Sequence, residues 1–218
     1  MSKIKNQNTS EELMYIIGLT GGIASGKSSV SNILKQEFKA NIIDLDVVAR
    51  EITTKNSLAY TDIINYFGPN ILEEDGQINR KKLGKIVFAD RDAKKKLEEI
   101  THFRILEILE NRLDQAKKNN TKLIFIDSPL LIETNWHNKV NEVWLVYVNL
   151  ETQISRLMER DTISYEDAIK RIESQISLEE KRKYATVIIN NNDSFEKTKE
   201  QVISSYKNTY NLIKNHKL

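Results

Sequence analysis

The chain of 218 residues contains no cysteine, only two prolines and no long apolar run. The absence of cysteine excludes a disulfide framework and a metal cluster bound by thiolates. No apolar segment approaches the roughly 18 residues that a membrane-spanning helix requires, and the polar first dozen residues do not resemble a secretion signal. We therefore expect a protein of the cytoplasm that has no membrane partner.

The chain also lacks a strong excess of charge of either sign. Lysine and arginine number 33 against 31 acidic residues, which gives a formal net charge of +2. An excess this small gives no reason to expect a nucleic-acid partner, so any basic site must be local. At this length one substantial core is expected, whereas the oligomeric state is left open.

Five short apolar runs, each followed by polar residues, are the candidate strands. The runs are uninterrupted rather than alternating, as is typical of strands that helices cover on both faces. Helical patterns lie between them, which predicts a three-layer α/β fold around a five-stranded parallel sheet. The predicted strands are residues 15–19, 40–45, 123–126, 142–148 and 186–189.

Two stretches exceed a minimal alternation of strand and helix, and each is predicted to be an insertion over the active face. Residues 58–118 are helical throughout in pattern, and residues 150–184 hold two helices, the second opening with the capping pattern Ser164…Asp167. The tail from Asn190 is interpreted as a solvated surface helix. The remaining predicted divisions are a disordered lead-in at residues 1–13 and a core formed by residues 14–57, 119–149 and 185–218.

Residues 21–28 read Gly-Gly-Ile-Ala-Ser-Gly-Lys-Ser and match the phosphate-binding motif G-x-x-x-x-G-K-[ST] between a strand and a helical pattern. Glycine lets such a loop turn tightly and bring its N–H groups against phosphate oxygens. Lys27 is predicted to bridge the outer phosphates of ATP, and Ser28 to offer its hydroxyl to Mg²⁺. The predicted nucleotide-binding residues are Gly21, Gly22, Ile23, Ala24, Ser25, Gly26, Lys27, Ser28 and Ser29.

Carboxylates follow two of the predicted strands. Asp127 ends the third one, as an acid that helps to hold Mg²⁺ does in P-loop enzymes, although an aspartate there could instead cap the loop before Pro129. Asp44 and Asp46 close the second strand, whose carboxyl end lies beside the P-loop in a parallel sheet. The residues alone leave open which of the two receives the proton of an acceptor hydroxyl and which caps the helix expected near Val47.

Two arginines lie on one face of a predicted helix. Arg156 and Arg160 are four residues apart, between a strand end and a polar turn. In a P-loop kinase such arginines can close over the transferring phosphate, which makes them candidate catalytic residues. The alternative is that they are ordinary surface charges.

Beyond the P-loop, a series of short motifs occurs in a fixed order along most of the chain. They are Ile43-Asp44-Leu45-Asp46, Phe67-Gly68, Asp75-Gly76, Asn79-Arg80, Thr101-His102-Phe103-Arg104-Ile105, Asp127-Ser128-Pro129-Leu130-Leu131-Ile132-Glu133, residues 153–160 and residues 171–175. Many families share a P-loop, but this ordered set is specific. From about Ile16 to Asn192 it resembles the dephospho-coenzyme A kinase family.

The resemblance implies that the γ-phosphate of ATP is transferred, with Mg²⁺, to the ribose 3′-hydroxyl of dephospho-coenzyme A. It implies Asp46 as the catalytic base and leaves Asp44 structural. Residues 58–118 would bind the acceptor and residues 150–184 would form a lid. The expected acceptor contacts are Arg80, Leu83, His102, Arg104 and Leu130, with Lys85 as a further cation that no motif supports.

Three residues depart from the pattern of the family. Ala24 replaces a frequent glycine, which predicts that its backbone avoids positive φ. Phe103 stands where proline is usual, and this puts the path of the acceptor segment and the role of His102 in question. Thr186 stands where aspartate is common, at the base of the predicted lid.

Two other functions fit parts of the sequence. A P-loop kinase for a nucleoside or another small alcohol would keep the P-loop and Asp46, but it does not account for the motifs at residues 101–105 and 127–133. A GTP-binding switch needs a guanine-reading Asn-Lys-x-Asp after a strand. The near match at residues 138–141, Asn-Lys-Val-Asn, lacks the aspartate and precedes its strand.

Overall fold

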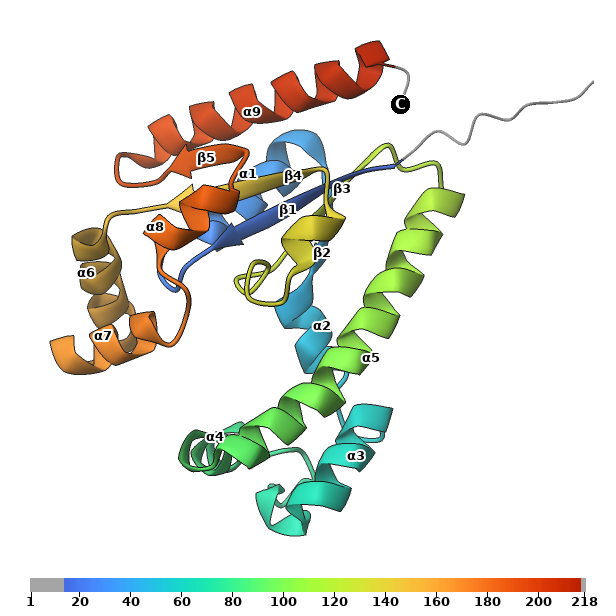
Figure 1. Cartoon of the computed structure of the whole chain (residues 1–218), viewed down its shortest axis with the longest axis vertical. Helices are drawn as coiled ribbons and strands as arrows, with labels where there is room; N and C mark the ends of the chain where they lie inside the picture. The colour runs from blue at the N-terminus through green and yellow to red at the C-terminus, as the bar shows by residue number, and fades with distance from the viewer. Residues whose placement is uncertain (1–13, 217–218) are drawn as a thin grey trace, which may run out of the picture.

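The computed structural model describes residues 14–216, so the predicted lead-in at residues 1–13 lies outside the described residues. Within this range the chain forms a five-stranded, all-parallel sheet in the order β2-β3-β1-β4-β5 (Figure 1). The strands are β1 (Tyr15–Gly21), β2 (Asn41–Asp44), β3 (Leu123–Asp127), β4 (Glu142–Tyr147) and β5 (Val187–Asn190). The predicted parallel sheet is confirmed, and each strand begins and ends within two residues of its predicted bounds.

One face of the sheet is covered by α1 (Lys27–Phe38) and α9 (Phe195–His216). Successive strand residues point to opposite faces, so Ile17, Leu19 and Phe125 all face this layer. They are buried there in a single apolar cluster together with side chains of both helices. This cluster fixes α1, and with it the P-loop, against the sheet.

Helix α9 corrects the interpretation of the tail as a solvated helix. Val202 is fully buried, Ile213 is buried as well, and the ring of Tyr206 stacks on that of Phe38 with 3.8 Å between the centroids. The lysines and asparagines cover only the outer side of the helix, and this abundance hid an apolar stripe at helical spacing. The tail is therefore part of the core.

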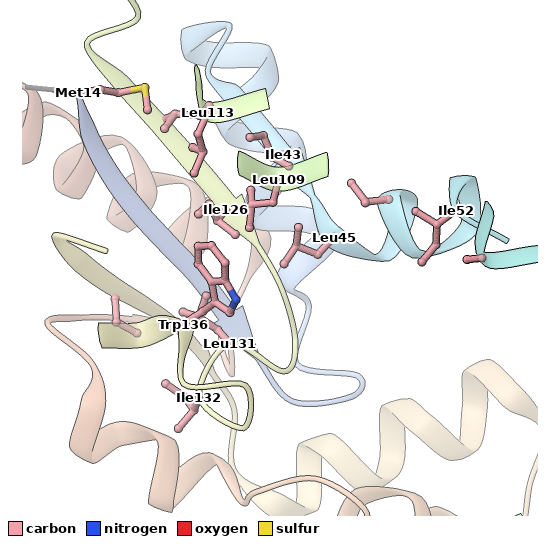
Figure 2. Packing of buried hydrophobic residues seen from close by; sticks show 14 residues of the cluster. Met14, Ile43, Leu45, Ile52, Leu109, Leu113, Ile126, Leu131, Ile132 and Trp136 are labelled. Carbon is pink, nitrogen blue, oxygen red and sulfur yellow. The ribbon is translucent and has the colours of Figure 1, made fainter. Parts of the chain in front are cut away.

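The opposite face of the sheet carries the second half of the long helix α5 (Arg91–Lys118). Figure 2 shows Leu109 and Leu113 of this helix in one cluster with Ile43 and Ile126 of the sheet. The first half of α5 runs beyond the sheet (Figure 1). It carries the remaining elements of the predicted insertion, which are α3 (Leu58–Phe67), the 3₁₀ turn η1 (Pro69–Ile71) and α4 (Arg80–Ala89).

Residues 150–184 form a second helical group near the carboxyl ends of the strands, away from α3 and α4 (Figure 1). The two predicted helices are α6 (Leu150–Asp161) and α7 (Tyr165–Glu173), followed by the short α8 (Leu178–Lys181) and η3 (Arg182–Tyr184). The predicted cap is confirmed, since Ser164 Oγ accepts a hydrogen bond of 3.1 Å from the N–H of Asp167. Two short elements complete the chain, α2 (Leu45–Glu51) and η2 (Trp136–Lys139). Across residues 14–216, no helix combines the length and apolar character needed to cross a bilayer.

Candidate active site

The P-loop joins β1 to α1, and Gly26 is its most constrained residue. Gly26 has a φ of +88°, and a Cβ atom there would lie 2.0 Å from Asn191 Nδ2, which donates a hydrogen bond of 2.9 Å to the carbonyl of Ser25. Only glycine fits this backbone and this space. The loop walls a cavity of about 440 Å³ lined by Gly22, Ile23, Ala24, Ser25, Gly26, Lys27, Ser28, Asp46, Pro129, Arg156, Arg160 and Gln175. Gly21 and Ser29 flank this lining without belonging to it.

Ala24 corrects the prediction that its backbone avoids positive φ. Its φ is +58°, in the left-handed region, where an alanine costs about 1 kcal/mol relative to a right-handed conformation. Its methyl group packs against the apolar cluster of α6 and α7 that contains Leu157 and Ala168. Full burial of a methyl group is worth about 0.8 kcal/mol, and Ala24 is partly buried, so this contact offsets part of the backbone cost.

Lys27, Ser31 and Asp127 form a buried polar group below the loop. Lys27 Nζ and Ser31 Oγ donate hydrogen bonds to the two different carboxylate oxygens of Asp127. Asp127 is the last residue of β3 and is only 2% exposed, so neither oxygen is left without a partner. Ser31 was missed by the sequence analysis, because a serine in the first turns of a helix carries no signal of a partner elsewhere.

Asp44 and Asp46 have separate environments. Asp44 Oδ1 accepts hydrogen bonds from the N–H groups of Asp46 at 2.9 Å and Val47 at 3.1 Å, which confirms Asp44 as the helix cap. The helix it caps, α2, begins at Leu45 rather than near Val47. Asp46 does not cap the helix, and it lines the P-loop cavity.

The pKa of Asp46 is raised above its ordinary value of 3.8. Partial burial is the largest cause, and repulsion from Asp44 and Asp127 acts in the same direction. The cations of Lys27 and Arg50 oppose this shift. A carboxylate whose pKa is raised accepts a proton more readily, which suits a residue that receives the proton of a hydroxyl.

A second cavity of about 620 Å³ lies between α5 and the segment that follows β3. Two predicted acceptor contacts, His102 and Leu130, line it. Asp46 and Pro129 line both this cavity and the cavity of the P-loop, so the two cavities meet at these residues. Phe103 continues α5 as an exposed residue, so the segment around His102 is an unbroken helix.

The other predicted acceptor contacts lie outside both cavities. Arg80 Nη2 donates a hydrogen bond of 2.7 Å to Thr53 Oγ1, and Leu83 is buried in the apolar cluster of the insertion. Arg104 lies on another side of α5, where it pairs with Glu107 at 3.1 Å and lines a separate groove. Lys85 lines a shallow hollow on α4. The motif at Leu83 thus reflects the core of the insertion.

Both arginines of α6 line the P-loop cavity. Arg156 Nη2 donates a hydrogen bond of 3.0 Å to the carbonyl of Asn191, and Arg160 Nε donates one of 2.8 Å to Asp161 Oδ1. Arg156 is partly buried by this contact, whereas the side chain of Arg160 is 55% exposed, so the alternative of an ordinary surface charge stays open for Arg160. Thr186, the third departure from the family pattern, exchanges hydrogen bonds with the backbone of Val143 at 2.9 and 3.0 Å.

Lys181, the last residue of α8, is a buried cation that the sequence analysis missed. Its side chain is 0% exposed, and its Nζ lies 2.5 Å from the carbonyl oxygen of Pro129 and 2.9 Å from Glu133 Oε1. Burial lowers the pKa of this ammonium group, and the hydrogen bond and charge of Glu133 act in the opposite direction. Lys181 therefore fastens α8 to the segment that walls both cavities.

We expect Lys181→Met to lower the free energy of unfolding by about 2 kcal/mol, because it leaves the carboxylate of Glu133 without its cation. For a chain of this size that is roughly 4–8 °C in Tm. Thermal unfolding measures the effect, with Lys183→Met as the control because the side chain of Lys183 is 68% exposed. Adding Glu133→Gln should recover part of the loss. Equal Tm values for the two single variants would contradict the prediction.

Comparisons with known proteins agree with this geometry. The family model described as dephospho-CoA kinase matches residues 15–197. A dephospho-CoA kinase from Carboxydothermus hydrogenoformans is 48% identical over 192 residues, which cover 88% of this chain and 93% of that protein. The solved dephospho-CoA kinase from Campylobacter jejuni has a TM-score of 0.68 at 31% identity, with 89% of this chain and 96% of that chain covered. The protein TT1252 from Thermus thermophilus has a TM-score of 0.78 at 30% identity, with 90% and 97% covered. The chain belongs to the dephospho-CoA kinase family.

Proposed function

We propose that this protein transfers the γ-phosphate of ATP to the ribose 3′-hydroxyl of dephospho-coenzyme A, which gives coenzyme A and ADP. One observation carries the proposal: Asp46 and Pro129 line both the P-loop cavity and the larger cavity beside α5. A terminal phosphate held by the P-loop and a hydroxyl held in the larger cavity would therefore meet beside a single carboxylate.

The donor half of the reaction rests on the P-loop and the cations around it. The N–H groups of the loop and the amino end of α1 bind phosphate oxygens. Lys27, Arg156 and Arg160 bring three positive charges to the same cavity, where they balance the charge that spreads over the transferring group. These residues position ATP and stabilise the transition state electrostatically.

Asp46 orients the acceptor hydroxyl and receives its proton. Phosphoryl transfer has a loose transition state, so the proton can leave late and a carboxylate is a sufficient base. The pKa of Asp46, raised by its partial burial, increases its capacity to take this proton. As the oxygen–phosphorus bond to the acceptor forms, the bond to the ADP leaving group breaks.

The residues at the P-loop fit Mg²⁺. This ion takes oxygen ligands, keeps several waters, and usually binds one or two protein groups together with substrate phosphates. Ser28 offers an exposed hydroxyl in the first turn of α1. Asp127 lies below the loop with both oxygens bonded to Lys27 and Ser31, so in this proposal it would act on the ion through one of the waters that Mg²⁺ keeps. When bound, the ion would neutralise charge on the phosphates.

The two helical groups, residues 58–118 and 150–184, have different roles in the proposed reaction. In this proposal residues 58–118 bind the acceptor, with His102 of α5 and Leu130 at the wall of the larger cavity. Residues 150–184 form the lid, which brings Arg156 and Arg160 to the donor. Residues 14–57, 119–149 and 185–218 are the nucleotide-binding core.

Incubation of the protein with ATP, Mg²⁺ and dephospho-coenzyme A tests the proposal. The expected product carries a new phosphate on the ribose 3′-oxygen, which phosphorus NMR or mass spectrometry identifies, with one ADP formed per product. A panel of nucleosides and small alcohols serves as the comparison. Turnover of one of these, with none of dephospho-coenzyme A, would overturn the assignment of the acceptor.

A further inference from the structure

The predicted lid, residues 150–184, holds one residue of the P-loop from two sides. The N–H of Ile23 donates a hydrogen bond of 3.0 Å to Gln175 Oε1, and the carbonyl of Ile23 accepts one of 2.8 Å from Gln153 Nε2. Gln153 lies in α6 and is 4% exposed, whereas Gln175 follows α7 and lines the P-loop cavity. Both backbone polar groups of Ile23 are therefore bonded to side chains of the lid.

Apolar contacts join the same two parts of the molecule. Ile23 and Ala24 pack against the buried cluster formed by α6 and α7, whose members include Ile154 and Ile172. The fit continues at Gly22, where a Cβ atom would lie 2.7 Å from Gln153 Nε2. The apex of the P-loop, residues 22–24, is thus packed into the lid as well as bonded to it.

The backbone at this apex needs support from outside the loop. Ala24 has a φ of +58°, and alanine on its own prefers the right-handed region. The hydrogen bond that Gln153 donates and the one that Gln175 accepts fix the orientation of the neighbouring residue Ile23. Phosphate binding depends on the direction of the N–H groups of such a loop. The contacts that hold the apex therefore also affect the affinity for ATP.

We propose that Gln153 and Gln175 are positioning residues that hold the P-loop apex in the form that binds the phosphates of ATP, so that lid and donor loop act as one unit. The inference rests on the ATP-binding half of the proposed function and requires nothing of the acceptor. It also accounts for Ala24, because the lid supplies both the hydrogen bonds beside its left-handed backbone and the apolar contact for its methyl group.

Binding of ATP to the full chain without acceptor tests the proposal by calorimetry. Gln153→Met and Gln175→Met keep the length of the side chain and remove its hydrogen bonds. We expect each to weaken ATP binding roughly tenfold, the effect of losing about 1.4 kcal/mol of bonding to a partly buried peptide. The matched control is Gln115→Met, since Gln115 is exposed on α5. The double variant should lose about 30-fold rather than 100-fold, because both glutamines act on Ile23.

Two further measurements separate positioning from a general structural role. The KM for dephospho-coenzyme A should stay within about twofold of the parent value. Collapse of the lid would instead raise the KM for ATP and the KM for dephospho-coenzyme A together. In an Ala24→Gly background the loss caused by Gln153→Met should shrink to about threefold, since glycine adopts positive φ unaided. Thermal unfolding identifies variants that fold, and Gln175→Met carries the test if the more buried Gln153→Met does not.

An ATP affinity in both single variants equal to that of Gln115→Met would overturn the proposal. Equal losses for ATP and for the acceptor would do the same. Because the affinity for ATP is measured without any acceptor, this result stands whichever alcohol the enzyme phosphorylates.

Discussion

Asp46→Asn is expected to lower kcat by about 10²-fold or more while ATP affinity stays nearly unchanged, as removal of a positioned base does. Asp46 lines both cavities, and its neighbour Asp44 is engaged in capping α2. Asparagine keeps the shape of the side chain but cannot receive the proton of the acceptor. Steady-state kinetics, together with calorimetric titration of ATP, measure the two effects separately.

The matched control for this variant is Asp44→Asn. Asparagine caps helices as well as aspartate does, so this change keeps the hydrogen bonds to the N–H groups of residues 46 and 47. We expect its kcat to stay within a few-fold of the parent value. Full activity in Asp46→Asn would refute the assignment and transfer the role to Asp44 or Asp127.

The raised pKa of Asp46 predicts two pH-dependent effects, one on the activity of the parent protein and one on the stability of Asp46→Asn. In the proposed mechanism Asp46 acts as the ionised carboxylate, so kcat/KM of the parent protein should fall in acid with a midpoint above 3.8. Because the folded chain binds this proton more tightly than the unfolded chain, the stability that Asp46 contributes is present below pH 3.8 and is lost as the pH rises through its folded pKa. At pH 7 the Tm of Asp46→Asn should therefore equal or exceed that of the parent protein.

The parts of the site that the sequence predicts are local in the chain. The P-loop is one contiguous motif, and Asp44 caps α2 through N–H groups only two and three residues away. By contrast, Ser31, Gln153 and Lys181 meet their partners 96, 130 and 52 residues away. The pairings of these three side chains depend on how the sheet, α6 and α8 pack, and no spacing in the sequence expresses that.

Two predictions were wrong, each for its own reason. The backbone of Ala24 is left-handed at a place where Ile23 and Ala24 pack against α6 and α7, and a rule for isolated alanine cannot include such contacts. Composition suggested a solvated tail, whereas the period of its apolar residues places Val202 and Ile213 on the sheet. At Ala24 tertiary contacts outweighed a local preference, whereas in the tail the apolar period was present in the sequence and the polar composition concealed it.

Lys27→Met is expected to lower kcat/KM for ATP by about 10²- to 10³-fold, since it removes a cation from the P-loop cavity. It should also weaken ATP binding, which distinguishes it from Asp46→Asn. Lys27 forms an ion pair with Asp127, so the protein without ATP should also become less stable. Kinetics, calorimetry and thermal unfolding measure the three effects. Lys35→Met is the control, because Lys35 is an exposed lysine in the last turn of the same helix.

The combination of Lys27→Met with Asp127→Asn separates the structural contribution of Lys27 from its contribution to catalysis. Lys27→Met alone leaves a carboxylate that is 2% exposed, with Ser31 as its remaining hydrogen-bond partner among residues 14–216. The cost of such a buried charge is several kcal/mol. Asparagine at position 127 removes that charge, so the double variant should regain most of the lost Tm. Its activity should stay low, because no cation returns to the P-loop. If activity recovered together with Tm, the effect of Lys27 would be one of stability alone, and the role in phosphate binding would be refuted.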